Sequence, residues 1–80
     1  MEREVIVDKV IEIVKESIDD DSVEVNAESA KDSTENWDSM MHLMVISNIE
    51  EGFGITMTME AMENCNSVET LTNFISKQDI

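Results

Sequence analysis

The sequence predicts an all-α protein, a four-helix bundle with a short third helix and a long loop between helices 1 and 2. Three observations favour this fold class. Apolar residues recur at helical spacing in separate segments, the 80 residues contain no proline, and there are neither internal repeats nor low-complexity tracts. A chain of this length usually forms one domain, so residues 1–80 are expected to fold as a single unit.

The first helix is expected over about residues 2–17. Its apolar positions follow the i, i+3, i+4, i+7 spacing of an amphipathic helix, while charged residues occupy the other face. These positions are Val7, Val10, Ile11, Val14 and Ile18. The β-branched content would also suit a strand, but a period of two residues would place charges on both faces, so the helical period decides.

Residues 19–37 are expected to form a long loop, because polar residues dominate this stretch and apolar residues are scattered. Loops of this length are usually functional or disordered. Val23 and Val25 are the expected points at which the loop is anchored to the core. Asn36 is expected to adopt a left-handed backbone conformation just before the next helix.

The second helix is expected over about residues 39–52, with Asp38 as its N-cap. Gly54 follows the helix as a natural stop. One apolar stripe is expected to face the core, and it consists of Val45, Ile46, Ile49 and Phe53.

Met40 and Leu43 lie outside this stripe, on the side of Ser39, because residues three or four apart share a helix face. The sequence leaves two alternatives for this apolar pair. It is either a docking surface beside the serine or a pair that packs beneath the long loop, since methionine suits both environments.

The remaining chain is expected to form a short third helix near residues 58–64 and a fourth that starts near residue 68 and ends before Asp79. Ser67 is placed to cap the fourth helix. The apolar spacing of that helix comes from Val68, Leu71, Thr72 and Ile75. Cys65 is expected to be a small buried hydrophobic residue and not a nucleophile.

The formal net charge of −14 and the isoelectric point near 4.1 argue against nucleic-acid binding, because phosphates would repel such a surface. Proteins with basic patches are expected as partners instead. From Asp32 to Ser76 there is no Lys or Arg, whereas eight Asp and Glu occur. Ser39 lies within this acidic stretch.

The single cysteine, Cys65, allows no internal disulfide and fits a reducing compartment. The N-terminus begins with charged residues, and no apolar stretch approaches the length of a membrane span. We therefore expect a cytoplasmic, monomeric protein without a signal peptide or a membrane segment.

Catalysis has little support in the sequence. His42 follows Ser39 by three residues, but neither a glycine-rich oxyanion loop nor a G-x-S-x-G turn accompanies this pair. His42 is expected to be exposed. One His and one Cys do not make a zinc site, so no metal ligands are assigned.

A calcium sensor is a rival interpretation, because the chain is acidic, methionine-rich and helical. The loop that begins at Asp19 does not fit that interpretation. Val23 occupies the fifth position, Glu24 stands where a glycine is required, and Ala30 stands where a bidentate Glu is required.

Ser39 follows its N-cap Asp38 at a helix start, where the first amides have no partner within the helix. A phosphate ester on this hydroxyl would be stabilised by those amides and by the helix dipole, by roughly 0.3–1 kcal/mol when exposed. This favours a modified serine over a catalytic one. The alternative from these residues alone is that Asp38 and Ser39 simply cap the helix.

Over nearly its whole length the chain resembles the acyl and peptidyl carrier proteins, which bear 4′-phosphopantetheine on the serine of an Asp-Ser-Leu motif. The resemblance includes the first amphipathic helix, the long loop, and the segments WDSM at 37–40, IEEGFGI at 49–55 and SVETLTNFI at 67–75. It implies the carrier-protein fold and a non-catalytic carrier whose cargo is an acyl or aminoacyl thioester.

The resemblance also implies roles for individual residues. Ser39 would be the attachment site, Asp38 its capping neighbour, and Met40 with Leu43 the apolar contacts for partners. Glu50 and Glu51 would join an acidic recognition face. The implied partners are a phosphopantetheinyl transferase, which uses coenzyme A, and acyl- or aminoacyl-processing enzymes with basic docking patches.

Three residues depart from the common pattern of these carriers. Met40 replaces the usual Leu, Asn36 stands where Gly is frequent, and Ser47 is polar where many carriers have an apolar contact. Trp37 before Asp38 resembles carriers of specialised pathways, such as polyketide or nonribosomal peptide synthesis, more than those of primary fatty-acid synthesis.

The methionines suggest a further hypothesis, that an adaptable interior admits an acyl chain between the helices. The residues concerned are Met44, Met57, Met59 and Met62. A function of a different class, an unmodified acidic helical adaptor, remains the alternative to a carrier.

Overall fold

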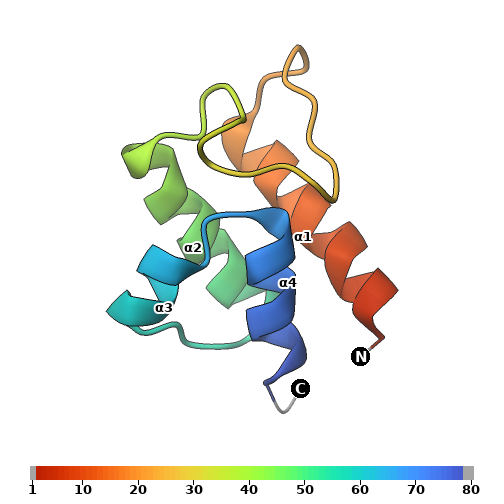
Figure 1. Cartoon of the computed structure of the whole chain (residues 1–80), viewed down its shortest axis with the longest axis vertical. Coiled ribbons are helices and arrows are strands. Elements are labelled where there is room, and N and C mark those ends of the chain that lie inside the picture. Colours follow the sequence, from red (N-terminus) through yellow and green to blue (C-terminus); the bar gives the residue numbers. More distant parts are fainter. Residues whose placement is uncertain (1, 79–80) are drawn as a thin grey trace.

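The computed structural model describes residues 2–78 and contains four helices (Figure 1). They are α1 (Arg3–Ile18), α2 (Ser39–Phe53), α3 (Met59–Asn64) and α4 (Val68–Ser76). The expected ends of the first three helices lie within one residue of the observed ends. The fourth ends before Asp79, as expected, although Asp79 itself lies outside the described residues. The described part of the chain has no β-strand, and the all-α fold class is confirmed.

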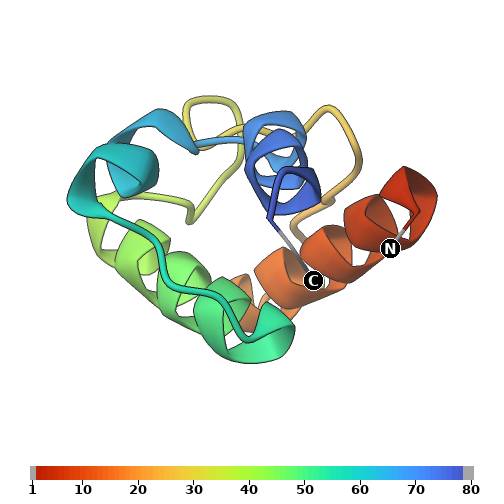
Figure 2. The ribbon, with the colours of Figure 1, turned by 90° about the horizontal axis from the view of Figure 1, so that it is seen from below.

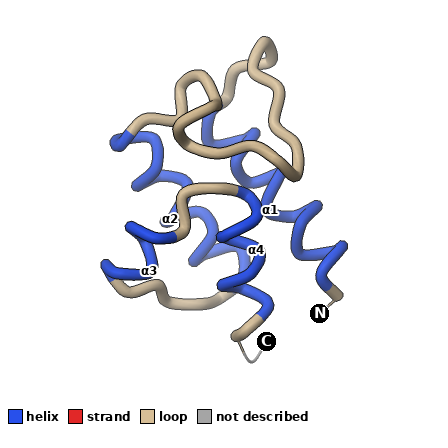
Figure 3. The backbone as a smooth tube through the Cα atoms, in the orientation of Figure 1, coloured by secondary structure: helices blue, strands red, loops and turns tan. Residues whose placement is uncertain are grey.

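The helices form two layers. α1 packs against both α2 and α4. Figure 2 shows α4 lying over α1, and α3 lying over α2, on the same side of the α1–α2 pair. The long loop closes the bundle at the end where α2 begins (Figure 3). This arrangement places the start of α2 beside both α3 and the loop.

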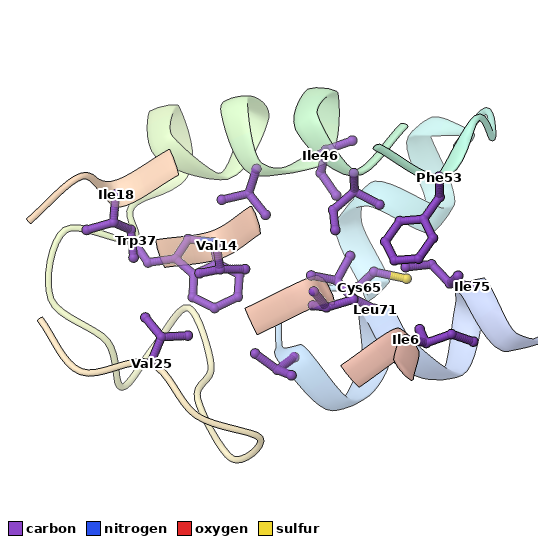
Figure 4. Close-up of a cluster of buried hydrophobic side chains, with 14 of the residues drawn as sticks. Ile6, Val14, Ile18, Val25, Trp37, Ile46, Phe53, Cys65, Leu71 and Ile75 are labelled. Carbon is purple, nitrogen blue, oxygen red and sulfur yellow. The ribbon is translucent and has the colours of Figure 1, made fainter. Parts of the chain in front are cut away.

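A single apolar cluster occupies the space between the layers (Figure 4). The expected α2 stripe of Val45, Ile46, Ile49 and Phe53 is buried, and so is the expected α4 set. The α1 stripe was predicted with a rotation error, because Ile6 is buried whereas Val7 and Ile11 are only partly buried. Since α1 contacts two helices, its buried face follows the four-residue ridge through Ile6, Val10 and Val14.

The loop is held at the points that the sequence indicated. Val23 and Val25 are both buried, and Asn36 has a left-handed backbone with φ of 66°. The side-chain nitrogen Nδ2 of Asn36 donates to the Asp20 carboxylate at 3.0 Å. Hydrogen bonds from Ser22 and Asn36 hold the pKa of Asp20 below its ordinary value, with Ser22 contributing most.

A second contact joins the loop to the connection between α3 and α4. The Val68 amide donates to the Ser29 carbonyl at 2.9 Å, and the Lys31 amide donates to the Asn66 carbonyl at 2.8 Å. These bonds form an isolated antiparallel bridge between Ala30 and its opposite residue, Ser67. The loop backbone is therefore fixed on the side of the molecule that faces Ser39.

The helix ends carry the expected signals. Ser67 and Thr70 form a reciprocal capping box at the start of α4, so the predicted cap is confirmed. Gly54 ends α2 in the left-handed conformation with φ of 66°, also as predicted. Within residues 2–78, no helix combines the length and the hydrophobicity that crossing a membrane requires.

Candidate functional site

Ser39 is the first residue of α2, and its side chain is exposed. The Asp38 carboxylate accepts a hydrogen bond from the Met41 amide at 2.8 Å, which makes Asp38 the N-cap. The helix offers no acceptor for the amides of Ser39 and Met40. The hydroxyl therefore stands in solvent at the positive end of the helix dipole, where an anionic substituent is stabilised.

Lys31 is the residue at this site that the sequence interpretation missed. Its Nζ donates to Oγ of Ser39 at 3.4 Å. The two residues are connected by an irregular loop, so no helical or strand period relates them. The one available signal was that Lys31 is the last cation before the acidic stretch that begins at Asp32.

A groove of about 340 Å³ lies beside Ser39, between the start of α2 and α3. It is lined by Lys31, Ser39, His42, Leu43, Met59, Met62, Glu63 and Asn66. A larger hollow of about 700 Å³ is lined by the end of α1 and the start of the loop, at residues 15, 16 and 18–25, and contains no candidate site residue. The groove joins polar groups near the hydroxyl to an apolar wall of Leu43 and Met62, which suits a phosphate followed by a mixed polar and apolar chain.

His42 is buried, with 9% of its surface exposed, so the prediction that it is exposed is wrong. Trp37 Nε1 donates to His42 Nδ1 at 3.0 Å. Because the indole can only donate, Nδ1 is the acceptor, and Nε2 carries the hydrogen that is donated to the Met62 carbonyl at 3.0 Å. Both ring nitrogens are thus occupied, and His42 has no free nitrogen to act as a base for Ser39.

Met40 and Leu43 are 81% and 64% exposed. Of the two alternatives for this pair, packing beneath the loop is wrong. Met44 and Met59 are also exposed, at 55% and 73%, so they do not belong to the interior that the acyl-chain hypothesis assumed. Leu43 and Met59 line the groove between α2 and α3, whereas Met40 and Met44 lie outside it.

Glu50 and Glu51 lie near the other end of α2, about 17–18 Å along the axis from Ser39 at 1.5 Å per residue. Glu51 is exposed. The Glu50 carboxylate accepts a hydrogen bond from the Met57 amide at 2.9 Å, which helps to hold the connection between α2 and α3. Glu50 therefore has a structural contact that the sequence did not indicate.

Cys65 is buried in the core, as expected. Burial raises the pKa of its thiol above the ordinary value, because the charged thiolate would lose its hydration. A neutral, inaccessible thiol is a poor nucleophile. The exposed Ser39 hydroxyl is therefore a better candidate for modification than the buried Cys65 thiol.

Comparisons with known proteins identify the family of the chain. Residues 5–75 match the family model described as "Phosphopantetheine attachment site", a range that includes all of α2 and α3 and the groove between them. A comparison with curated protein sequences found no match. The cofactor of the matching family is 4′-phosphopantetheine, bound covalently, and the match supports a carrier role for the chain. The chain therefore belongs to the family of phosphopantetheine-bearing acyl and peptidyl carrier proteins.

Proposed function

We propose that residues 1–80 form a single carrier domain and that the prosthetic group is attached to the hydroxyl of Ser39. One observation carries this proposal: within the matching range, Ser39 presents an exposed hydroxyl on the first residue of α2. When bound, the group supplies a flexible arm whose terminal thiol holds an acyl or aminoacyl cargo as a thioester.

The residues of the chain itself hold and present this group without catalysing a reaction. Asp38 fixes the first turn of α2 through the Met41 amide, so the Ser39 hydroxyl has a defined position. The amides of Ser39 and Met40 are available to the phosphate oxygens. Carrier domains of this family are generally non-catalytic, which fits a site where His42 has no free nitrogen.

The proposed partners are a phosphopantetheinyl transferase and acyl- or aminoacyl-processing enzymes with basic docking patches. Met40 and Leu43 would give these enzymes apolar contacts beside Ser39, and their exposure supports that role. Glu51, with Glu50 at its side, would add acidic contacts farther along α2. The net charge of −14 supports the choice of basic partner surfaces.

For the pathway, we propose a discrete carrier of specialised biosynthesis, of the polyketide or nonribosomal peptide type. The support is the resemblance of the Trp37-Asp38-Ser39 segment to such carriers. Trp37 is 2% exposed, so it would not contact a cargo directly. Its influence on the pathway would come through the shape that it gives to the loop.

Mass spectrometry after incubation with coenzyme A and a phosphopantetheinyl transferase tests the attachment site. The wild type should gain one arm, and Ser39→Ala should gain none. Ser47→Ala is the matched control, because Ser47 is an exposed serine on the same helix and should not affect loading. An unmodified wild type would indicate the adaptor alternative, and an arm on Ser39→Ala would place the attachment elsewhere.

A further inference from the structure

Lys31 is the cation that the structure brings into contact with Ser39. The other cations of the chain are Arg3, Lys9 and Lys15 in α1 and Lys77 after α4. Of these, Lys9 donates to the Gly52 carbonyl at 2.7 Å, near the opposite end of α2 from Ser39. Lys31 Nζ, in contrast, lies 3.4 Å from the Ser39 hydroxyl.

The position of Lys31 is set by the fold. Its amide is bonded to the Asn66 carbonyl, and Ala30 before it forms the bridge to Ser67. The Ala30 carbonyl also accepts from the Ser33 amide at 3.1 Å, so the backbone on both sides of Lys31 is held. The Lys31 side chain therefore starts from the loop where it lies beside the connection between α3 and α4, and it reaches Ser39 at the start of α2.

The contact in the unmodified chain joins an ammonium group to a neutral hydroxyl at a long distance. A phosphodiester on that oxygen would place a full negative charge within reach of the same ammonium. Charge-assisted hydrogen bonds are shorter and stronger than neutral ones, so the modified serine suits Lys31 better than the free hydroxyl does. Glu63 lines the same groove, and its carboxylate would repel the phosphate unless a cation lies nearby.

We propose that Lys31 is a positioning residue that binds the phosphodiester on Ser39 and directs the base of the arm to the groove between α2 and α3. This inference rests on the proposed attachment at Ser39. Lys31 shares the groove with Leu43 and Met62, so its pairing with the phosphate favours that side of α2 over the side of Met44.

³¹P NMR of the loaded protein tests this proposal without any enzyme assay. Lys31→Gln should shift the phosphodiester resonance, and Lys31→Arg should restore most of the shift because it keeps the charge. Lys15→Gln removes one charge from the exposed face of α1 and should leave the resonance unchanged. Added salt should move the wild-type resonance toward that of Lys31→Gln, whose own resonance should respond much less.

The proposal is overturned if the wild type and Lys31→Gln give the same phosphorus shift and the same salt response. The same holds if Lys15→Gln produces a change as large as Lys31→Gln does. These results require protein that mass spectrometry shows to be loaded at Ser39. A failure to load would instead contradict the proposed function, so the two failures are distinct.

Discussion

His42 connects three parts of the molecule through one side chain. It lies in α2, accepts from Trp37 at the end of the loop, and donates to the Met62 carbonyl in α3. Within residues 2–78, every buried polar side-chain atom has a hydrogen-bond partner. α3 has only six residues and no buried side chain, so this bond contributes to its position over α2. The groove beside Ser39 depends on that position.

Replacing His42 by Leu should destabilise the fold, because Trp37 would keep a buried N–H without an acceptor. The expected loss in the free energy of unfolding is about 1–3 kcal/mol, measured by urea denaturation. In a double-mutant cycle, Trp37→Phe should lower the free energy of unfolding less in the His42→Leu protein than in the wild type. His42→Gln, which keeps an acceptor and a donor, is the control. If His42→Leu and His42→Gln were equally stable, the bond would have no energetic role.

The site residues differ in how far local sequence determines them. The positions of Asp38 and Ser39 at the start of α2 were predictable because an N-cap and the residue after it are set by neighbours in the chain. Lys31 and His42 were not, because their contacts form only when the loop closes over α2 and when α3 folds back. Their partners lie eight and twenty residues away, at Ser39 and Met62.

At the scale of elements, α2 is fixed at both ends. Asp38 caps the start, and at the other end the Gly54 amide donates to the Glu50 carbonyl. Lys9 of α1 supplies the cation that the last turn of α2 lacks, through its bond to Gly52 and a position 4.7 Å from the centre of the Phe53 ring. This fixation keeps the serine at a defined end of the bundle.

Gly54→Ala should lower the free energy of unfolding by about 1 kcal/mol, because the left-handed conformation is unfavourable for a residue with a Cβ. Nothing lies within 4 Å of the position that the new Cβ would occupy, so the cost is conformational and not a clash. Gly54→Asn should cost less, since Asn tolerates this conformation. Equal urea midpoints for the wild type and Gly54→Ala would contradict this explanation.

The helices could be predicted because each has its own periodicity and its own end signals. The exact face of α1 could not, since it has apolar residues at positions 5, 6 and 7 as well as 10 and 11. Because α1 packs against both α2 and α4, Ile6 is buried in the core, whereas Val5 is 50% exposed. A choice between adjacent apolar residues depends on tertiary packing, which a local pattern does not contain.

At the scale of the whole molecule, the fold determines where Ser39 lies, and the charge determines which partners are attracted to it. The two layers and the fixed loop give Ser39 a constant position, whereas the acidic surface influences what approaches it. Only Lys31 among the five cations contacts Ser39, so the long-range field around the site is dominated by carboxylates. A basic partner is attracted from a distance, and the single cation acts only at short range.

The rate of loading should therefore fall as salt is added. Between about 0.1 and 1 M salt the Debye length shrinks from roughly 10 to 3 Å, which removes long-range attraction. We expect kcat/KM for a phosphopantetheinyl transferase to fall about tenfold over this range. Glu51→Gln and Glu12→Gln each remove one exposed carboxylate, from α2 and α1 respectively.

If α2 is the docking face, Glu51→Gln should reduce kcat/KM more than Glu12→Gln does, and it should also weaken the salt dependence. If only the net charge matters, the two variants should be equivalent, because both leave a net charge of −13 (−14 plus 1). A loading rate that did not change with salt would contradict electrostatic attraction altogether. In that case the exposed Met40 and Leu43 would have to provide the recognition beside Ser39 by apolar contact alone.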